Sequence, residues 1–321
     1  MNYKKHMISI SVLLLFLGTF YAATVEAAEE KPIIVCTTEV VGSLVREYLG
    51  DNADVVVLCQ ASLCPADFDM KPSDVYSVRN ARILFKQNIP GEFWLQGLLE
   101  AAGNIYLTQV AIPGVYNTPE GAIRYVEWVG GNLTDILEID LSAEKAAMIK
   151  EIGDVSSWMN GQAQEIQASS VKVICMTWQK AFVESAGFQV VATYNPPETL
   201  SASDINGILN IAKSEGVALI VDNLQIDVEF GKGIADQVGA EHVVLTNFPG
   251  AIPGTGSLAQ MFRYNADQLY KSANTWRYSA ALREEKERLV NQVTIFQITT
   301  SLAAVVAGVE AVLLYVWKRR R

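Results

Sequence analysis

Two series of alternating strand and helix patterns constrain the fold of this 321-residue chain more than any other feature. Short apolar runs such as IIVCTT (33–38) and DVVVLC (54–59) are typical of buried strands, and an amphipathic helical pattern follows each of them. A second series begins with VKVICM (171–176) and continues through FQVVATY and VALIVDN. Because strands that alternate with helices form parallel sheets, we predict an α/β protein with two parallel-sheet lobes.

One long helical pattern separates the two series. It covers residues 141–170, and its amphipathic spacing suits a helix that runs between lobes. We therefore predict an N-terminal lobe at 28–140, a connecting helix, a C-terminal lobe at 171–276 and a ligand cleft between the lobes. The prolines, glycines and asparagines of 113–140 predict a mostly looped stretch with one helix at EGAIRYVEWV.

The two ends of the chain carry membrane-related patterns. Residues 1–27 predict a signal peptide, with two lysines, an apolar run and a small-residue cleavage site. Residues 293–317 are long and apolar enough to cross a bilayer, and the basic tail 318–321 favours the cytoplasmic side. We predict a single-pass cell-membrane protein with both lobes outside, joined to the anchor by a charged stalk helix at 277–292. Glu310 lies within the anchor, where it either snorkels to the interface or contacts another membrane subunit.

The charge and the histidine count exclude several functions. The net charge of −10 argues against a nucleic-acid partner and suits a cationic ligand or simple solubility. Only two histidines exist, His6 in the signal region and His242 at a strand start, where a structural role is expected. Without a Ser-His-Asp or Cys-His pairing or a phosphate-binding glycine loop, the chain is not predicted to be an enzyme.

Candidate site residues lie where the predicted strands end, because parallel α/β lobes bind ligands at the carboxyl ends of their strands. The candidate metal-ligating side chains are Asp222, Cys59, Cys64, Asp67, Glu39 and Met176. The candidate side chains for a larger polar ligand are Trp178, Gln179, Asn223, Gln225 and Asn247. Asp222 is the foremost of these, since it ends a buried strand and is expected to face the cleft.

Over about residues 32–275 the order of patterns resembles the solute-binding proteins of zinc- and manganese-type ABC importers. The pieces that carry the resemblance are IIVCTTEVVGSLVREYLGD, the loop PADFDMKPSD, GEFWLQGLLEAAG, the connecting helix and MFRYNADQL. The resemblance implies that a metal ion or metal complex is captured between the lobes as cargo. It also implies delivery of that cargo to an ABC permease driven by a cytoplasmic ATPase.

The family's histidine ligands do not carry over to this sequence. The first expected ligand falls on Ala66, and the second falls in the segment VYNTPEGAIRYVEW. The third falls on Met176 or Thr177, and the expected carboxylate falls near Thr246 and Asn247. Zinc held by several imidazoles is therefore excluded by the histidine count alone.

Three kinds of replacement chemistry remain open. Cys59 and Cys64 form either a disulfide or, with Met176, a soft site for copper(I) or zinc. Carboxylates of Glu39, Asp67, Asp69 and Asp222 offer oxygen to a hard cation, although Asp67 and Asp69 also suit helix capping. The amide and tryptophan side chains suit a polar organic ligand or a chelated metal. A protein-interaction module on the same scaffold is the alternative function.

Overall fold

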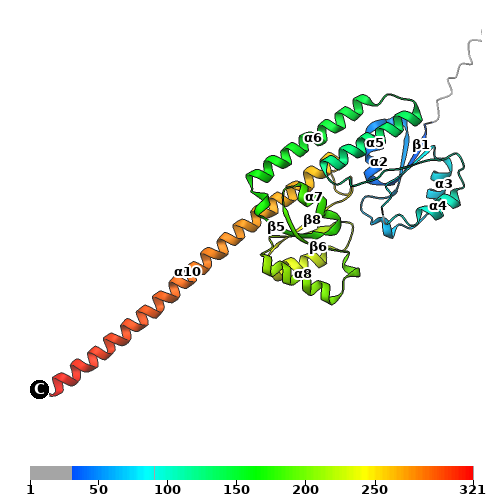
Figure 1. The fold of residues 1–321 in the computed structure, drawn as a ribbon. Helices are drawn as coiled ribbons and strands as arrows, with labels where there is room; N and C mark the ends of the chain where they lie inside the picture. The colour runs from blue at the N-terminus through cyan, green and yellow to red at the C-terminus, as the bar shows by residue number, and fades with distance from the viewer. Residues whose placement is uncertain (1–30, 90, 321) are drawn as a thin grey trace, which may run out of the picture.

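The computed structural model describes residues 31–89 and 91–320, so the predicted signal peptide with His6 lies outside the described residues. Two parallel four-stranded sheets form the two lobes, as predicted (Figure 1). The first sheet has the order β2-β1-β3-β4, with strands β1 (Ile33–Thr38), β2 (Asp54–Cys59), β3 (Ile83–Lys86) and β4 (Thr108–Ala111). The second has the order β6-β5-β7-β8, with strands β5 (Lys172–Met176), β6 (Gln189–Tyr194), β7 (Leu219–Asn223) and β8 (Glu241–Leu245).

Helices flank both sheets and join them. The N-terminal lobe contains α2 (Glu39–Leu49), α3 (Pro72–Asn80), α4 (Leu95–Ala102) and α5 (Pro119–Leu137). The C-terminal lobe contains α7 (Lys180–Ser185), α8 (Ala202–Glu215) and α9 (Glu229–Val238). Two longer helices are α6 (Ser142–Glu165) and α10 (Leu258–Arg320). Short 3₁₀ turns lie at Gly50–Asn52, Pro65–Asp67, Ala168–Ser170, Thr177–Gln179 and Pro197–Thr199.

The stretch before the connecting helix differs from the sequence prediction. Instead of a mostly looped segment, α5 runs for 19 residues. Thr118 caps it by accepting a hydrogen bond from the amide of Gly121 at 3.1 Å, and Pro119 occupies the first turn, where proline is favoured. Gly130 is needed inside the helix because a methyl group there would overlap the ring of Tyr48. The glycine that suggests a loop therefore permits close helix packing.

Helix α6 connects the lobes, and its end is fastened to α10. It packs against α5 and then passes along α10 toward the C-terminal lobe (Figure 1). Just after its last turn, the guanidinium of Arg277 donates to the carbonyl oxygens of Ile166 and Gln167, and to Ser170 Oγ at 3.0 Å. A cation that satisfies carbonyls at a helix C-terminus stabilises that end. The connection between α6 and α10 is therefore polar as well as apolar.

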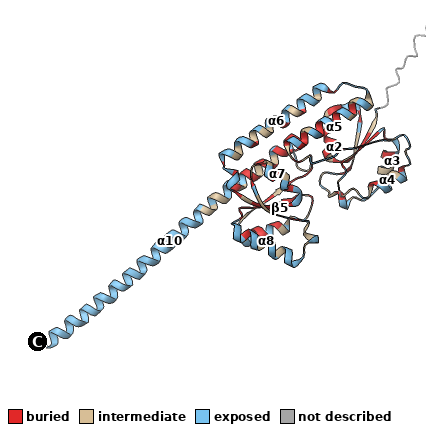
Figure 2. Ribbon diagram, viewed as in Figure 1, coloured by how far each residue is buried: buried red, intermediate tan, exposed pale blue. Residues whose placement is uncertain are grey.

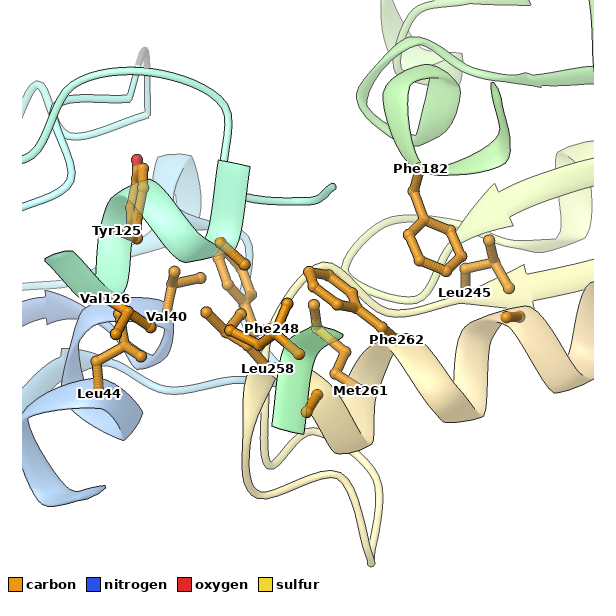
Figure 3. Close-up of a cluster of buried hydrophobic side chains, with 14 of the residues drawn as sticks. Val40, Leu44, Tyr125, Val126, Phe182, Leu245, Phe248, Leu258, Met261 and Phe262 are labelled. Carbon is orange, nitrogen blue, oxygen red and sulfur yellow. The ribbon is translucent and has the colours of Figure 1, made fainter. Parts of the chain in front are cut away.

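The largest hydrophobic cluster extends through both lobes and is organised by the first turns of α10 (Figure 3). Leu258 and Phe248 lie toward Val40 of the N-terminal lobe, while the Phe262 ring stacks on Phe182 of the C-terminal lobe with centroids 5.7 Å apart. Since these side chains belong to one buried cluster, the two lobes are not independent packing units.

Helix α10 continues far beyond the lobes. The predicted last lobe helix, stalk and anchor form one helix of 63 residues. The buried side chains on one face of its first turns end at Ala273, and the projecting part is exposed (Figure 2). By length and composition α10 contains a segment able to cross a membrane, and no part of that apolar window is buried against the lobes. Arg277 and Arg283 still contact the lobes, whereas the apolar window farther along the helix is not covered by any described part of the lobes.

The shared core predicts that both lobes unfold together. Phe262→Ala should lower the free energy of unfolding by about 3–5 kcal/mol, because it removes a fully buried ring between the lobes. Circular dichroism of the full-length protein in detergent during denaturant unfolding should show one transition at lower denaturant. Phe93→Ala, at an exposed ring, is the control and should change the midpoint little. Loss of only one lobe's signal would contradict a shared core.

Because of the Glu47 carboxyl group, we expect the protein to lose stability as the pH rises. Burial, reinforced by Glu151 and opposed by Arg46, raises the pKa of Glu47 to about 7. Its Oε1 is buried without a hydrogen-bond partner. The folded protein therefore holds a proton that the unfolded chain releases near pH 4.5, so stability falls between pH 4.5 and 7. Glu47→Gln should stabilise the protein at pH 8 by on the order of 2 kcal/mol and have little effect at pH 4.

The matched control for this prediction is Glu120→Gln, at an exposed position on the neighbouring helix α5. Denaturant unfolding at several pH values should leave its pH dependence the same as in the wild type. Equal stabilisation by Glu47→Gln at pH 4 and pH 8 would rule out ionisation of Glu47 as the cause.

Candidate solute site between the lobes

Strand ends of the two lobes meet at one boundary and are joined by hydrogen bonds. From the loop after β7, Gln225 donates through Nε2 to the carbonyl oxygen of Ala61, in the loop after β2, at 2.8 Å. Tyr116 donates through its hydroxyl to the carbonyl oxygen of Asn247 at 2.9 Å. Asn117 Nδ2 donates to the carbonyl oxygen of Trp178 at 2.8 Å. These contacts place the predicted segments 59–69 and 222–225 against each other.

A network of amides fixes the C-terminal side of this boundary. Besides its bond to the other lobe, Gln225 Nε2 lies 3.0 Å from Thr246 Oγ1, and Gln225 Oε1 accepts from the amide of Asn247 at 3.1 Å. Asn223 Oδ1 accepts from the amide of Gln225 at 3.4 Å. Asn265 of α10 donates to the carbonyl oxygen of Thr246 at 2.8 Å. The loops after β7 and β8 are therefore tied to each other and to the start of α10.

Among the residues that the structure describes, two amide oxygens at this boundary have no hydrogen-bond donor. They are Gln179 Oε1, from the turn after β5, and Asn247 Oδ1, from the loop after β8. Both side chains are more than nine-tenths buried. Because a buried amide oxygen without a donor costs free energy, these two atoms favour a ligand or solvent molecule that donates hydrogen bonds.

The N-terminal side supplies hydroxyls, an amide and one carboxyl group. Thr38 donates to Gln87 Oε1, and Thr37 donates to the carboxyl group of Glu92. The amide of Asn88 also donates to Glu92, at 2.7 Å. Burial raises the pKa of Glu92, although these hydrogen bonds oppose the rise. Both faces of the boundary therefore present mainly amides and hydroxyls, with the carboxyl group of Glu92 on the N-terminal side.

Asp222 does not face the boundary, contrary to the sequence prediction. Its carboxylate is fully buried, accepts from the Tyr194 hydroxyl, and lies 2.7 Å from Nε2 of His242. A methyl group on Gly231 of α9 would overlap the carboxylate, so the helix backbone covers it closely. Burial, reinforced by Asp222, raises the pKa of Tyr194, which keeps its hydroxyl a donor. This triad is internal to the C-terminal lobe, and His242 has the structural role expected for it.

The sulfur candidates are a buried thioether and two free thiols. Met176 is fully buried in the second apolar cluster of the C-terminal lobe. Cys59 and Cys64 are both free thiols, so the disulfide alternative is not formed in this structure. Burial, reinforced by the nearby Cys64, raises the pKa of Cys59 to about 12. Cys36 and Cys175 are buried in strands, as predicted.

The carboxylate candidates are dispersed. Glu39, in the first turn of α2, is paired with Arg46 and lies near the Gly250 loop, where a Cβ would be 3.7 Å from Glu39 Oε1. Asp67 and Asp69 are exposed, and neither caps the following helix. Instead, Asp74 in the first turn of α3 caps that helix, because its carboxylate accepts a hydrogen bond from the amide of Lys71 at 2.8 Å. The predicted carboxylate site for a hard cation is therefore not assembled.

A bare metal ion does not fit the boundary. Within residues 31–89 and 91–320, no three His, Cys, Asp or Glu side chains are grouped so that they could hold a metal ion. Zinc prefers imidazole and thiolate, and manganese prefers carboxylates, whereas this boundary presents amides and hydroxyls.

Several residues of the boundary were not predicted from the sequence. Tyr116 and Asn117 lie within the segment VYNTPEGAIRYVEW, where the resemblance expects a histidine ligand. Their place in the segment of that expected ligand could have identified them as boundary residues. Tyr194 gave no signal, because its contact with Asp222 depends on the pairing of β5 with both β6 and β7.

Removing Gln225 should weaken the contact between the lobes. Gln225→Ala deletes the donor to Ala61 and leaves the amide of Asn247 without its acceptor. We expect a loss of about 1–3 kcal/mol in the free energy of unfolding, measured by urea unfolding of the full-length protein. Gln237→Ala, an exposed glutamine on α9, is the control and should cost far less. Equal effects of the two substitutions would show that the Gln225 contacts contribute nothing.

Comparisons with known proteins agree with this architecture. Residues 34–272 match the family model for zinc-uptake complex component A periplasmic proteins. The manganese-binding lipoprotein MntA of Halalkalibacterium halodurans is 20% identical over 259 residues, covering 73% of this chain and 86% of that protein.

Two solved structures show the same fold at low identity. The Mn-bound periplasmic metal-binding protein of Candidatus Liberibacter asiaticus aligns with a TM-score of 0.65 at 12% identity. That alignment covers 76% of this chain and 100% of the other. The solute-binding protein FpvC of P. aeruginosa, in complex with Ni²⁺, aligns with a TM-score of 0.65 at 13% identity, covering 77% and 98% of the two chains. The chain therefore belongs to the zinc-uptake component A family, the solute-binding proteins of metal ABC importers.

Proposed function

We propose that this protein is a membrane-anchored extracytoplasmic receptor of an ABC importer whose cargo is a chelated metal or another polar solute, held by hydrogen bonds. The observation that carries the proposal is the pair of buried amide oxygens, Gln179 Oε1 and Asn247 Oδ1, that lack donors at the boundary. A cargo with N–H or O–H groups, including metal-bound water, would satisfy both. Family membership supplies the importer as the destination of that cargo.

The amide and hydroxyl side chains at the boundary suit a metal complex better than a bare metal ion. A metal complex has already filled its coordination sphere, so its receptor needs surface complementarity rather than ligand atoms. Tyr116 and the half-exposed Trp178 add aromatic surface beside the amides. Aromatic rings with a few placed polar groups are typical of sites for organic ligands. This chemistry supports a chelate or organic solute over bare zinc or manganese.

Entry of cargo requires the boundary to open at its polar contacts. The hydrogen bonds Gln225–Ala61, Tyr116–Asn247 and Asn117–Trp178 close it directly in this structure. Each of these contributes only about 1 kcal/mol, whereas separating the lobes completely would expose the shared apolar core. Opening is therefore expected to be a local movement of the loops at the strand ends.

The features of helix α10 support the proposal that it anchors the protein in the membrane. Its apolar segment is unburied, and the cations Lys318, Arg319 and Arg320 end it. In this arrangement the lobes stand outside the membrane and the basic end lies in the cytoplasm, because cationic loops favour that side.

Native mass spectrometry of the full-length protein, purified from its own membranes, tests the cargo. We expect a retained organic or chelate species in the wild type, its loss in Asn247→Leu, and its retention in the control Asn132→Leu on the outer face of α5. Calorimetric titration with Zn²⁺ or Mn²⁺ alone should show no saturable binding. Saturable micromolar binding of either bare ion, with no organic species retained, would overturn the proposed cargo.

A further inference from the structure

The projecting part of α10 carries one apolar face in its stalk segment. Between residues 277 and 292 three large apolar side chains, Tyr278, Leu282 and Leu289, fall on the same side at helical spacing, and Val290 lies next to Leu289. All three are about half or more exposed. A lone helix segment with an exposed apolar stripe gains stability when another helix covers that stripe.

From Leu282 onward this apolar stripe follows a heptad pattern that continues into the apolar segment. Residues spaced alternately three and four apart form the stripe Leu282, Lys286, Leu289, Val293, Phe296, Thr300, Ala303, Ala307 and Glu310. An alternation of this kind keeps one seam facing a partner helix. The two charged members are Lys286, outside the apolar segment, and Glu310, inside it.

Glu310 is the unusual member of the stripe. Among the described residues it forms no hydrogen bond or ion pair, and it lies about 36 Å along the helix from Lys286 at 1.5 Å per residue. A carboxylate within a membrane segment is costly unless it is paired. Glu310 has the same heptad position as Leu282, Leu289 and Phe296, and residues at that position face a partner helix when two helices supercoil.

The charges decide which kind of helix covers the stripe. A parallel second copy of this chain would place Lys286 against Lys286 and Glu310 against Glu310, both of like charge. Like charges repel, most strongly at Glu310 inside the low-dielectric apolar segment, so a second copy is disfavoured. A different helix with a cation at the depth of Glu310 and an acidic residue near Lys286 would pair with both.

We infer that the stripe of α10 is a docking surface for a transmembrane helix of another subunit, which carries Lys, Arg or His opposite Glu310 and extends outside the membrane along the stalk. This inference rests on the membrane anchor of the proposed function and is independent of the cargo. It assigns α10 a role in recognition as well as in attachment.

Site-specific photo-crosslinking of the full-length protein in its native membranes tests this surface. A photoreactive residue replaces Leu289 or Phe296 on the stripe, and replaces Asn291 or Ile298 on the opposite face as controls. We expect crosslinks only from the stripe positions, to a peptide from a membrane span that contains Lys, Arg or His. Glu310→Leu should reduce their yield by about tenfold or more, while Val309→Leu, one residue away on the other face, should not.

Each other outcome overturns the inference. A product of twice the chain's mass would identify a second copy as the occupant. Equal crosslinking from both faces, or none from either, would show that the stripe is not a docking surface. Alkaline carbonate extraction of the same membranes separates the two proposals. Release of the protein would refute the anchor itself, whereas retention without stripe-specific crosslinks would refute only the docking surface.

Discussion

The packing of the first turns of α10 against both lobes is the interaction on which the rest of the structure depends. Leu258 and Phe262 belong to one buried cluster that includes side chains from both sheets' flanking helices. Since apolar burial is the largest stabilising contribution in a domain of this size, the lobes cannot separate widely without exposing this cluster. The boundary at the strand ends is held by a few hydrogen bonds instead, so it is the part of the interface that can open at low cost.

The framework at the strand ends is separate from the side chains at the loop tips. The loops after β7 and β8 are tied to each other and to Asn265 of α10. Those ties involve backbone groups and neutral side chains, so they persist whatever ligand type the loop tips present. Ala66 and Asn247 thus occupy positions where the family resemblance expects metal ligands, while the framework around them is kept.

Sequence patterns predicted the parallel sheet and alternating helices of each lobe, and the meeting of residues 59–69 with 222–225, because strands that alternate with helices form parallel sheets whose carboxyl ends share one edge. They did not give the order of the strands. They failed for side-chain direction at Asp222. Strand alternation allowed either face, and the choice depends on Gly231, which lets α9 approach, and on donors from Tyr194 and His242 on neighbouring strands. Tyr116 was missed because its role depends on a carbonyl group in the other lobe. Such contacts exist only after the chain is folded.

The hydrogen bonds from Arg277 to the end of α6 have a mechanical consequence. They join α10 to the end of α6 just where the helix leaves the lobes, and Arg283 reaches Gly239 one to two turns later. Tension applied at the far end of the helix would therefore reach the interior of the protein directly, since no flexible joint lies between. A tilt of the C-terminal segment would therefore reorient both lobes together.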